Sequence, residues 1–206
     1  AAGAYGAFSK SECPPERMIC YTTPASAPLQ HLMAAKADFL TGLLNYQTFR
    51  EKTIKAFRGA TQERNDPKLQ RRQPDVFTFL LMDMDRFKTV NDTHGHDVGS
   101  LAIQAVGVAI QNHVRETDLV GRYGGDEFMV LLLGETVTTA EPVRKHIMQG
   151  VSEARVFDHS GRRVSLRISV AGAQIRREEL QDPDKDFDEL FIQADEVLKA
   201  VKPPGR

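Results

Sequence analysis

The chain has 206 residues, which is enough for one domain of ordinary size with a modest flanking segment. Its 27 basic and 28 acidic side chains give a formal net charge of -1, so the composition does not indicate a surface for nucleic acid or anionic membrane. Hydrophobic residues make up 41% of the chain, and no apolar run approaches the roughly 18–20 residues needed to span a bilayer.

The first 28 residues differ in composition from the rest. Residues 1–28 are rich in Ala, Ser, Thr and Pro without sustained periodicity, which predicts a tail or a linker from an upstream sensory or receiver domain. The opening residues lack the basic region and apolar core of a secretory signal. Cys13 and Cys20 match no metal motif, and one pair makes no disulfide framework. We therefore expect a cytoplasmic protein with reduced thiols.

The domain itself is predicted to occupy residues 29–206. A helical pattern begins at Leu29, breaks at a turn at Thr41-Gly42, and resumes from Phe49 to Phe57. Residues 58–75 are polar, charged and interrupted by prolines, which predicts a solvated loop.

The middle of the chain carries two strand signals. The run VFTFLLMDMD, residues 76–85, predicts a buried strand that ends in carboxylates. Residues 99–116 have apolar side chains at helical spacing, so we expect one or two helices after this strand. Residues 118–134 form two apolar runs around a Gly-Gly pair, which predicts a β-hairpin.

The last part of the chain predicts a helix, a strand and a second helix. Residues 138–156 are helical in pattern, and Pro142 is tolerable only in the first turn. Residues 162–175 alternate as a strand does, and residues 186–202 form an amphipathic helix closed by PPGR. Strands with helices between them favour an α/β (α+β) fold with one sheet covered by helices.

Two carboxylate clusters indicate chemistry. One is Asp83-Met84-Asp85 at the end of the predicted strand, and the other is Asp126-Glu127 after the Gly-Gly pair. Carboxylates at the ends of neighbouring strands bind hard cations, and Mg²⁺ uses one or two carboxylates together with substrate phosphates. The glycines let a nucleotide lie against the turn. With Lys88 nearby and KPPGR at the end of the sequence, the pattern indicates phosphoryl transfer.

The segment RYGGDEF, residues 122–128, resembles the signature of GGDEF domains, enzymes that make cyclic dinucleotides. The resemblance covers about residues 38–206 and includes, in family order, DFLTGLLNYQTF, DMDRFKTVNDTHGHDVG, RETDLVGRYGGDEF, SVAGA and ADEVLKAVKPPGR. It implies an α/β domain with a central, mostly antiparallel sheet, similar to the palm of nucleotide polymerases and cyclases.

The resemblance assigns metal ligands and catalytic groups. Asp83 and Asp126 look like ligands of Mg²⁺ or Mn²⁺, with the carbonyl of Met84 as a third ligand. Glu127 looks like the acidic residue beside the attacking 3′-hydroxyl, where it helps the metal or acts as a base. Lys202 is expected to act on the terminal phosphates. Asp85 is interpreted as a turn residue.

The resemblance also assigns the substrate contacts. The backbone amides of Phe87 and Lys88 are expected to cradle the phosphates, because the start of a helix offers unpaired N–H groups to anions. The side chains of Lys202 and Arg206 match the basic residues that reach the terminal phosphates, and Asn91 matches the amide that reads the base edge. Gly124 and Gly125 complete the expected substrate site.

Two further groups of residues have structural alternatives. Arg115 and Asp118 stand where many family members carry an RxxD inhibitory site for the cyclic dinucleotide product, although an ion pair at a helix end would look the same. Pro142 stands where an assisting arginine is expected, with Arg144 close by. Arg122 is expected to brace the hairpin. The histidines His94, His96 and His113 are interpreted as structural or surface residues.

Ser100 is the position where the sequence departs most informatively from the family, because most members have Asp there. A carboxylate accepts hydrogen bonds from guanine N1–H and N2–H₂ and opposes the N1 acceptor of adenine, whereas a hydroxyl suits either base. A good bidentate base contact discriminates by on the order of 1–3 kcal/mol. Ser and Asp are both good N-caps, so the exchange is expected to keep a helix start. Serine here also resembles the hybrid promiscuous (Hypr) subgroup, which makes 3′,3′-cyclic GMP-AMP along with cyclic di-GMP.

The resemblance implies a homodimer that joins GTP and ATP, with each 3′-hydroxyl attacking the α-phosphate held by the other subunit and pyrophosphate leaving twice. One alternative is a GTP-specific diguanylate cyclase that makes only cyclic di-GMP. Another is a degenerate effector domain that binds nucleotide or cyclic dinucleotide without catalysis. We expect neither nucleic acid nor membrane as a partner of this segment.

Overall fold

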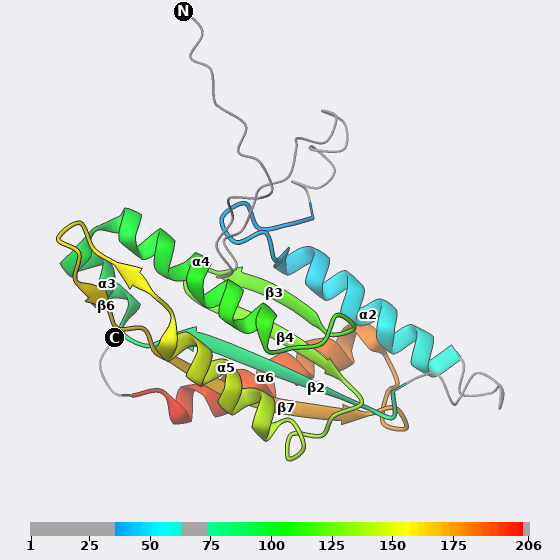
Figure 1. Cartoon of the computed structure of the whole chain (residues 1–206). Coiled ribbons are helices and arrows are strands. Elements are labelled where there is room, and N and C mark those ends of the chain that lie inside the picture. The colour runs from blue at the N-terminus through cyan, green and yellow to red at the C-terminus, as the bar shows by residue number, and fades with distance from the viewer. Residues whose placement is uncertain (1–35, 63–73, 204–206) are drawn as a thin grey trace, which may run out of the picture.

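The computed structural model describes residues 36–62 and 74–203. Its centre is a five-stranded sheet in the order β1-β3-β4-β2-β7 (Figure 1). The strands are β1 (Leu44–Asn45), β2 (Val76–Met84), β3 (Leu119–Gly124), β4 (Glu127–Leu133) and β7 (Ile168–Arg176). Every pairing is antiparallel except that of β1 with β3, so the predicted α/β fold with a mostly antiparallel sheet is confirmed. The tail expected over residues 1–28 and the start of the helical pattern at Leu29 lie outside the described residues.

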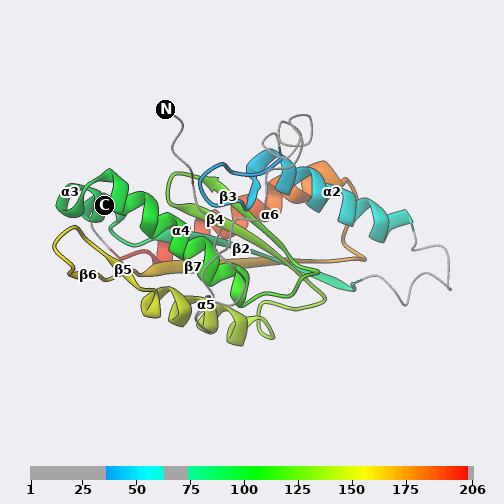
Figure 2. The ribbon, with the colours of Figure 1, turned by 45° about the horizontal axis from the view of Figure 1, so that its top comes forward.

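Helices cover both faces of the sheet (Figures 1 and 2). One hydrophobic core joins the sheet to α2 (Tyr46–Gln62) and α6 (Pro183–Val201). The other core joins it to α4 (His96–Asn112) and α5 (Glu141–Glu153). The short helix α3 (Phe87–His94) follows β2 and packs against α4.

Strand β2 belongs to both cores, which explains its composition. Phe77, Phe79 and Leu81 face the core under α2 and α6. Leu80 and Met82 face the core under α4 and α5. Because both faces are covered, all nine residues of β2 are buried, and apart from Thr78 and Asp83 the strand is apolar instead of alternating.

Several predicted turns and ends are confirmed. Gly42 has a φ of 71° in the turn before β1, and Gly125 has a φ of 51° in the turn between β3 and β4. Both values lie in the left-handed region that glycine adopts without steric cost. Pro142 lies in the first turn of α5, where its missing N–H costs no helical hydrogen bond.

The structure corrects two boundaries. Residues 58–62 continue α2 instead of starting the predicted loop, and residues 63–73 lie outside the described part of the chain. The strand predicted over residues 162–175 is divided, because its first residues pair elsewhere. β6 (Arg163–Val164) pairs with β5 (Val156–Phe157) in a separate hairpin beside α3 and α4, and β7 begins only at Ile168. Within the described ranges, no helix is long and apolar enough to cross a membrane.

Candidate active site

The two carboxylate clusters meet at one end of the sheet, as the sequence predicts. Asp83, near the end of β2, lies opposite Glu127, the first residue of β4. The backbone N–H of Met84 donates to the carbonyl of Asp126 at 3.2 Å, which ties the end of β2 to the hairpin turn. Asp83 is buried, with 7% of its surface exposed. Its carboxylate is held by the sheet and by an ion pair with Lys202.

A cavity of about 520 Å³ opens where these strands end. It is lined by most of the predicted metal, catalytic and substrate-contact residues, namely Asp83, Met84, Phe87, Lys88, Asn91, Asp126, Glu127 and Lys202. His96 and Pro203 also line it, and the sequence reasoning gave neither a role in the site. Arg206 lies outside the described residues.

Lys202 comes into the cavity from the C-terminal end of α6. Its ammonium contacts the carboxylate oxygen Oδ2 of Asp83, and only 18% of the Lys202 side chain is exposed. Its backbone N–H donates to the carbonyl of Leu198 at 3.0 Å, so the last helical turn fixes its position. The pair therefore places one positive and one negative group on the same wall of the cavity.

The donor set fits a magnesium-type ion. Asp83, Asp126 and the Met84 carbonyl offer hard oxygen atoms at one end of the sheet, and Mg²⁺ typically binds one or two carboxylates and completes its shell with water and phosphates. In the part of the chain that the structure describes, no group of three or more His, Cys, Asp and Glu side chains forms a closed metal cage. Two carboxylates and a carbonyl suit an ion of this type, which completes its shell with phosphate oxygens.

The start of α3 suits phosphate. Arg86 caps this helix with its backbone in the left-handed region, and its side chain makes no capping hydrogen bond. The N–H groups of Phe87 and Lys88 are in the first turn and have no carbonyl one turn earlier in the helix to receive them. Such N–H groups are suited to anions, and phosphate binding by these two residues stays a prediction.

Asn91 depends on a glycine in the neighbouring helix. A Cβ at Gly99 would lie 1.9 Å from the Asn91 side-chain oxygen, so only glycine lets the amide lie against α4. The sequence contains this glycine, but its role is visible only after α3 and α4 are packed together.

Ser100 is not a helix cap, so this part of the sequence interpretation is wrong. The helix begins one turn earlier, because Gly95, with a φ of 92°, ends α3 and caps α4. Ser100 lies inside α4, where its hydroxyl donates to the carbonyl of His96 at 2.9 Å. Among the described residues the cavity is lined by His96 and not by Ser100, which stands one turn further along.

Arg122 braces the hairpin turn, as predicted. Its guanidinium donates to the carbonyl of Gly125 through Nε at 3.0 Å and Nη2 at 2.6 Å. Nη1 donates to both carboxylate oxygens of Asp38 at 3.0 Å. Burial raises the pKa of Asp38, but hydrogen bonds from Thr41 and Arg122 outweigh it and hold that pKa below its ordinary value. The ionised pair fixes the Gly124-Gly125 turn beside the cavity.

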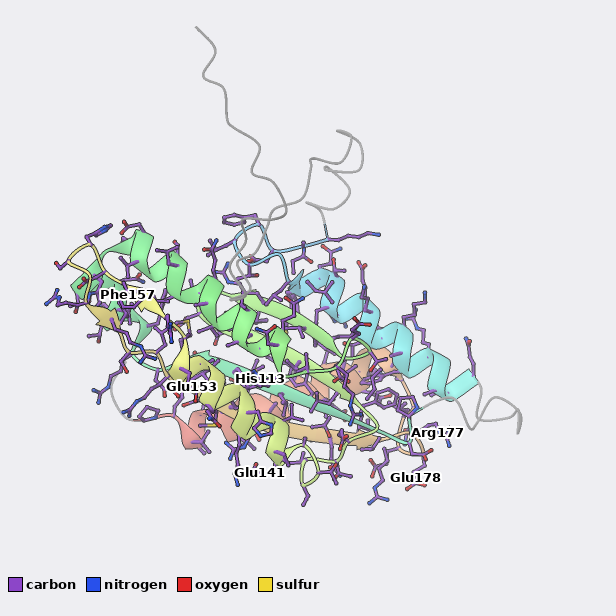
Figure 3. The ribbon with its side chains drawn as sticks, in the orientation of Figure 1. His113, Glu141, Glu153, Phe157, Arg177 and Glu178 are labelled. Carbon is purple, nitrogen blue, oxygen red and sulfur yellow. The ribbon has the colours of Figure 1, made fainter. Side chains whose placement is uncertain are left out.

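Of the histidines interpreted from the sequence as structural or surface residues (His94, His96 and His113), two have structural partners. His94 Nδ1 lies 3.1 Å from a carboxylate oxygen of Asp158, in the turn of the β5–β6 hairpin. His113, at the end of α4, hydrogen-bonds the carbonyl of Ala109 at 2.7 Å and packs against α5, where Gly150 leaves room for its ring (Figure 3). The structural interpretation of His94 and His113 is thereby confirmed, and His96 lines the cavity.

The side chains of the Arg115–Asp118 motif already have hydrogen-bond partners within the chain. One carboxylate oxygen of Asp118 accepts from the backbone N–H of Arg115 at 3.0 Å, and the other accepts from that of Leu133 at 3.1 Å. The guanidinium of Arg115 donates to Glu135 at 2.7 Å. Arg144 is held by two hydrogen bonds of 2.7 Å to Glu141. Asp118 therefore has a structural role, and each arginine has a carboxylate partner.

Comparison with known proteins agrees with this geometry. The family model described as "Diguanylate cyclase, GGDEF domain" matches residues 35–206. Uncharacterized protein YhcK of Bacillus subtilis is 32% identical over 177 residues, which are 86% of this chain and 45% of that protein. Diguanylate cyclase DosC of Escherichia coli is 34% identical over 131 residues, which are 62% of this chain and 26% of that protein. The chain thus spans less than half the length of these two relatives.

A solved structure supports the same relationship. The isolated GGDEF domain of PA1120 (TpbB or YfiN) from Pseudomonas aeruginosa is 30% identical to this chain and superposes with a TM-score of 0.67. The superposition covers 82% of this chain and 90% of that domain.

Proposed function

The chain belongs to the GGDEF domain family of diguanylate cyclases, and from this we propose that it joins two nucleoside triphosphates into a cyclic dinucleotide and releases two pyrophosphates. The observation that carries the proposal is the meeting of Asp83, Asp126 and Glu127 with Lys202 around one cavity. A generic scaffold has no need for two acidic strand ends, a lysine and a free helix start at the same place.

Each protomer is proposed to hold one nucleotide, with two protomers face to face. The 3′-oxygen of one nucleotide forms a bond to the α-phosphorus of the other, and the bond from that phosphorus to the bridging oxygen breaks, so pyrophosphate leaves with the electron pair. The hydroxyl proton passes to Glu127 or to water. Two such steps close the ring, which makes the homodimer essential.

The residues that line the cavity have different proposed roles. Asp83, Asp126 and the Met84 carbonyl would hold Mg²⁺ or Mn²⁺, which when bound neutralises charge on the phosphates. The first N–H groups of α3 orient the phosphate chain, and Lys202 balances its charge. Catalysis of this kind rests on positioning and on fixed charges.

Ser100 is proposed to admit both ATP and GTP, so that the products are cyclic GMP-AMP and cyclic di-GMP. Its hydroxyl hydrogen is used by the His96 carbonyl, which leaves a neutral acceptor facing outward from α4. The amino group of adenine and the N–H groups of guanine both suit such an acceptor. An ionised aspartate would instead oppose the N1 acceptor of adenine.

A GTP-specific cyclase that makes only cyclic di-GMP is the second candidate. It is favoured by the position of Ser100, one turn away from the residues that line the cavity. In that case the serine would be tolerated without choosing the base.

We also propose that the Arg115–Asp118 motif is an inhibitory site for a cyclic dinucleotide, in which Asp118 holds the backbone and Arg115 contacts the ligand. Binding there requires Arg115 to exchange Glu135 for a phosphate or a base edge. Product inhibition through this site is therefore expected to be weak.

Catalysis is tested by giving the purified protein Mg²⁺ with GTP and ATP, measuring pyrophosphate release and identifying products by mass. Asp126→Asn is expected to abolish the product. The control Asp75→Asn, at an exposed carboxylate paired with Arg177 far from the cavity, should leave it unchanged. Bound nucleotide without any cyclic dinucleotide would instead favour the effector function.

A further inference from the structure

A second cavity, of about 450 Å³, lies on the other side of α3 from the catalytic cavity. Its wall is formed by Thr89, Thr93 and His94 of α3 and by Ser165 and Arg167 of the segment between β6 and β7. Phe87, Lys88 and Asn91 of α3 line the catalytic cavity instead. The two cavities thus use different faces of one helix.

The cavities meet at the start of α3. Asp85, Arg86 and Pro203 line both of them. The second cavity is therefore adjacent to the part of the catalytic cavity formed by the start of α3, where the phosphates are proposed to bind.

Two arginines that line the second cavity, Arg86 and Arg167, are exposed and have no ion-pair partner among the described residues. Within residues 36–62 and 74–203, no carboxylate pairs with Arg86 or Arg167, whereas arginines such as Arg50 and Arg162 are held by aspartates. The one carboxylate in the wall, Asp85, accepts a hydrogen bond from the Ser169 hydroxyl at 2.6 Å. Two positive groups against one negative group make the cavity favourable for an anion.

The remaining wall supplies neutral donors. The hydroxyls of Thr89, Thr93 and Ser165 can each donate one hydrogen bond. His94 is oriented by Asp158 through Nδ1, so its Nε2 is the nitrogen left for another partner. Guanidinium groups bind phosphate oxygens through paired N–H donors, which suits a ligand with several such oxygens.

Arg86 has an unusual backbone conformation for a residue with a side chain. Arg86 has a φ of 54° and is the only residue other than glycine with a positive φ in the described part of the chain. Glycine adopts this conformation without steric cost, whereas a side chain is disfavoured there. The arginine therefore occupies a position that the backbone alone would give to glycine, at the junction of the two cavities.

We propose that this second cavity binds inorganic pyrophosphate as it leaves the catalytic cavity, through Arg86 and Arg167. The ligand identity rests on the proposed function, since that reaction is the source of pyrophosphate. Binding here separates the leaving group from the attacking nucleotide and makes pyrophosphate an inhibitor that need not displace substrate.

Calorimetry with sodium pyrophosphate tests the site without turnover. Arg167→Ala is the informative variant, because Arg167 lines the second cavity and not the catalytic one. We expect it to weaken pyrophosphate binding at least tenfold while binding of 3′-deoxy-GTP and the melting temperature stay unchanged. Arg155→Ala is the matched control, since Arg155 is exposed, lines neither cavity and carries the same charge.

Three results would overturn the site. If Arg167→Ala and Arg155→Ala weakened pyrophosphate binding equally, the effect would be one of general charge. If Arg167→Ala weakened binding of 3′-deoxy-GTP as much as that of pyrophosphate, Arg167 would belong to the nucleotide site. Orthophosphate binding as tightly as pyrophosphate would remove the diphosphate assignment. Arg86→Gly gives a second check, because relief of the backbone should preserve the fold while pyrophosphate affinity falls. An inactive protein that still binds pyrophosphate through Arg167 would overturn the proposed function and leave the anion site.

Discussion

The ammonium of Lys202 contacts the carboxylate of Asp83, so the end of the last helix is joined to the end of the central strand. Both side chains are largely shielded from water, and the contact lies on the wall of the catalytic cavity. This contact makes the C-terminal end of α6 part of the site instead of a peripheral helix end.

Replacing Lys202 by alanine should impair the enzyme more than the fold. The substitution removes the cation that balances Asp83 and the phosphates, and we expect kcat/KM to fall at least tenfold, which corresponds to about 1.4 kcal/mol of transition-state stabilisation. Steady-state pyrophosphate release measures it. Lys199→Ala is the control, because Lys199 pairs with Asp195 on the outer surface of the same helix. Similar losses in the two variants would contradict a specific role for Lys202.

Gly99→Ala should displace Asn91. The new Cβ would lie 1.9 Å from the Asn91 oxygen, so the amide must rotate away from the position proposed to read the base. We expect a rise in the KM for nucleotide with a small change in melting temperature. The control Gly107→Ala lies in the same helix, where the nearest atom to a Cβ is Leu43 Cδ1 at 3.3 Å. An unchanged KM in Gly99→Ala would show that Asn91 does not contact the nucleotide.

Asp158 should make the stability depend on pH in the acid range. Hydrogen bonds from the backbone N–H groups of Arg162 and Ser160 and from the Arg162 side chain lower the pKa of Asp158 to about 2, and His94 is its other partner. A carboxylate whose pKa is depressed by folding stabilises the fold above its unfolded pKa, and this contribution is lost as the pH falls from about 4 to about 2.

Thermal unfolding of Asp158→Asn tests the direction in which stability is expected to change with pH. Its melting temperature should lie below that of the natural protein at neutral pH, and the two should converge as the pH falls below about 4. Asp195→Asn, which removes a pair on the surface of α6, should change little at any pH. A gap that widens toward acid would contradict the assignment.

Glu135 should limit binding of cyclic dinucleotide at Arg115. A hydrogen bond from Thr139, then the Arg115 guanidinium, hold the pKa of Glu135 below its ordinary value despite the opposing effect of burial, so the glutamate is ionised at neutral pH. Glu135→Gln removes this competing charge. We expect cyclic di-GMP to inhibit the variant at several-fold lower concentration, and Arg115→Ala to remove the inhibition. Inhibition that is insensitive to both variants would place the product site elsewhere.

The sequence predicted those features that depend on residues adjacent along the chain. The apolar run over residues 76–85 and the Gly-Gly hairpin were recognisable because burial on both faces and a tight turn leave local patterns. The convergence of the acidic clusters followed from their positions at strand ends. Most of the predicted site residues then proved to line one cavity.

Contacts between distant segments left no such pattern. The Arg122–Asp38 and His94–Asp158 pairs each join segments that are adjacent only after folding. The start of α4 was misplaced because serine is a common cap, while the conformation of Gly95, one turn earlier, sets the actual boundary. The hairpin of β5 and β6 was missed because strands of two residues are too short to show alternation.

The decisive measurement of base selection is to identify by mass the products formed from an equimolar mixture of ATP and GTP with Mg²⁺. We expect cyclic GMP-AMP together with cyclic di-GMP from the natural protein, and mainly cyclic di-GMP from Ser100→Asp. Ser100→Ala serves as the control for loss of the hydroxyl without gain of charge. Cyclic di-GMP alone from the natural protein would contradict relaxed base selection, and the absence of any cyclic dinucleotide would contradict the cyclase itself.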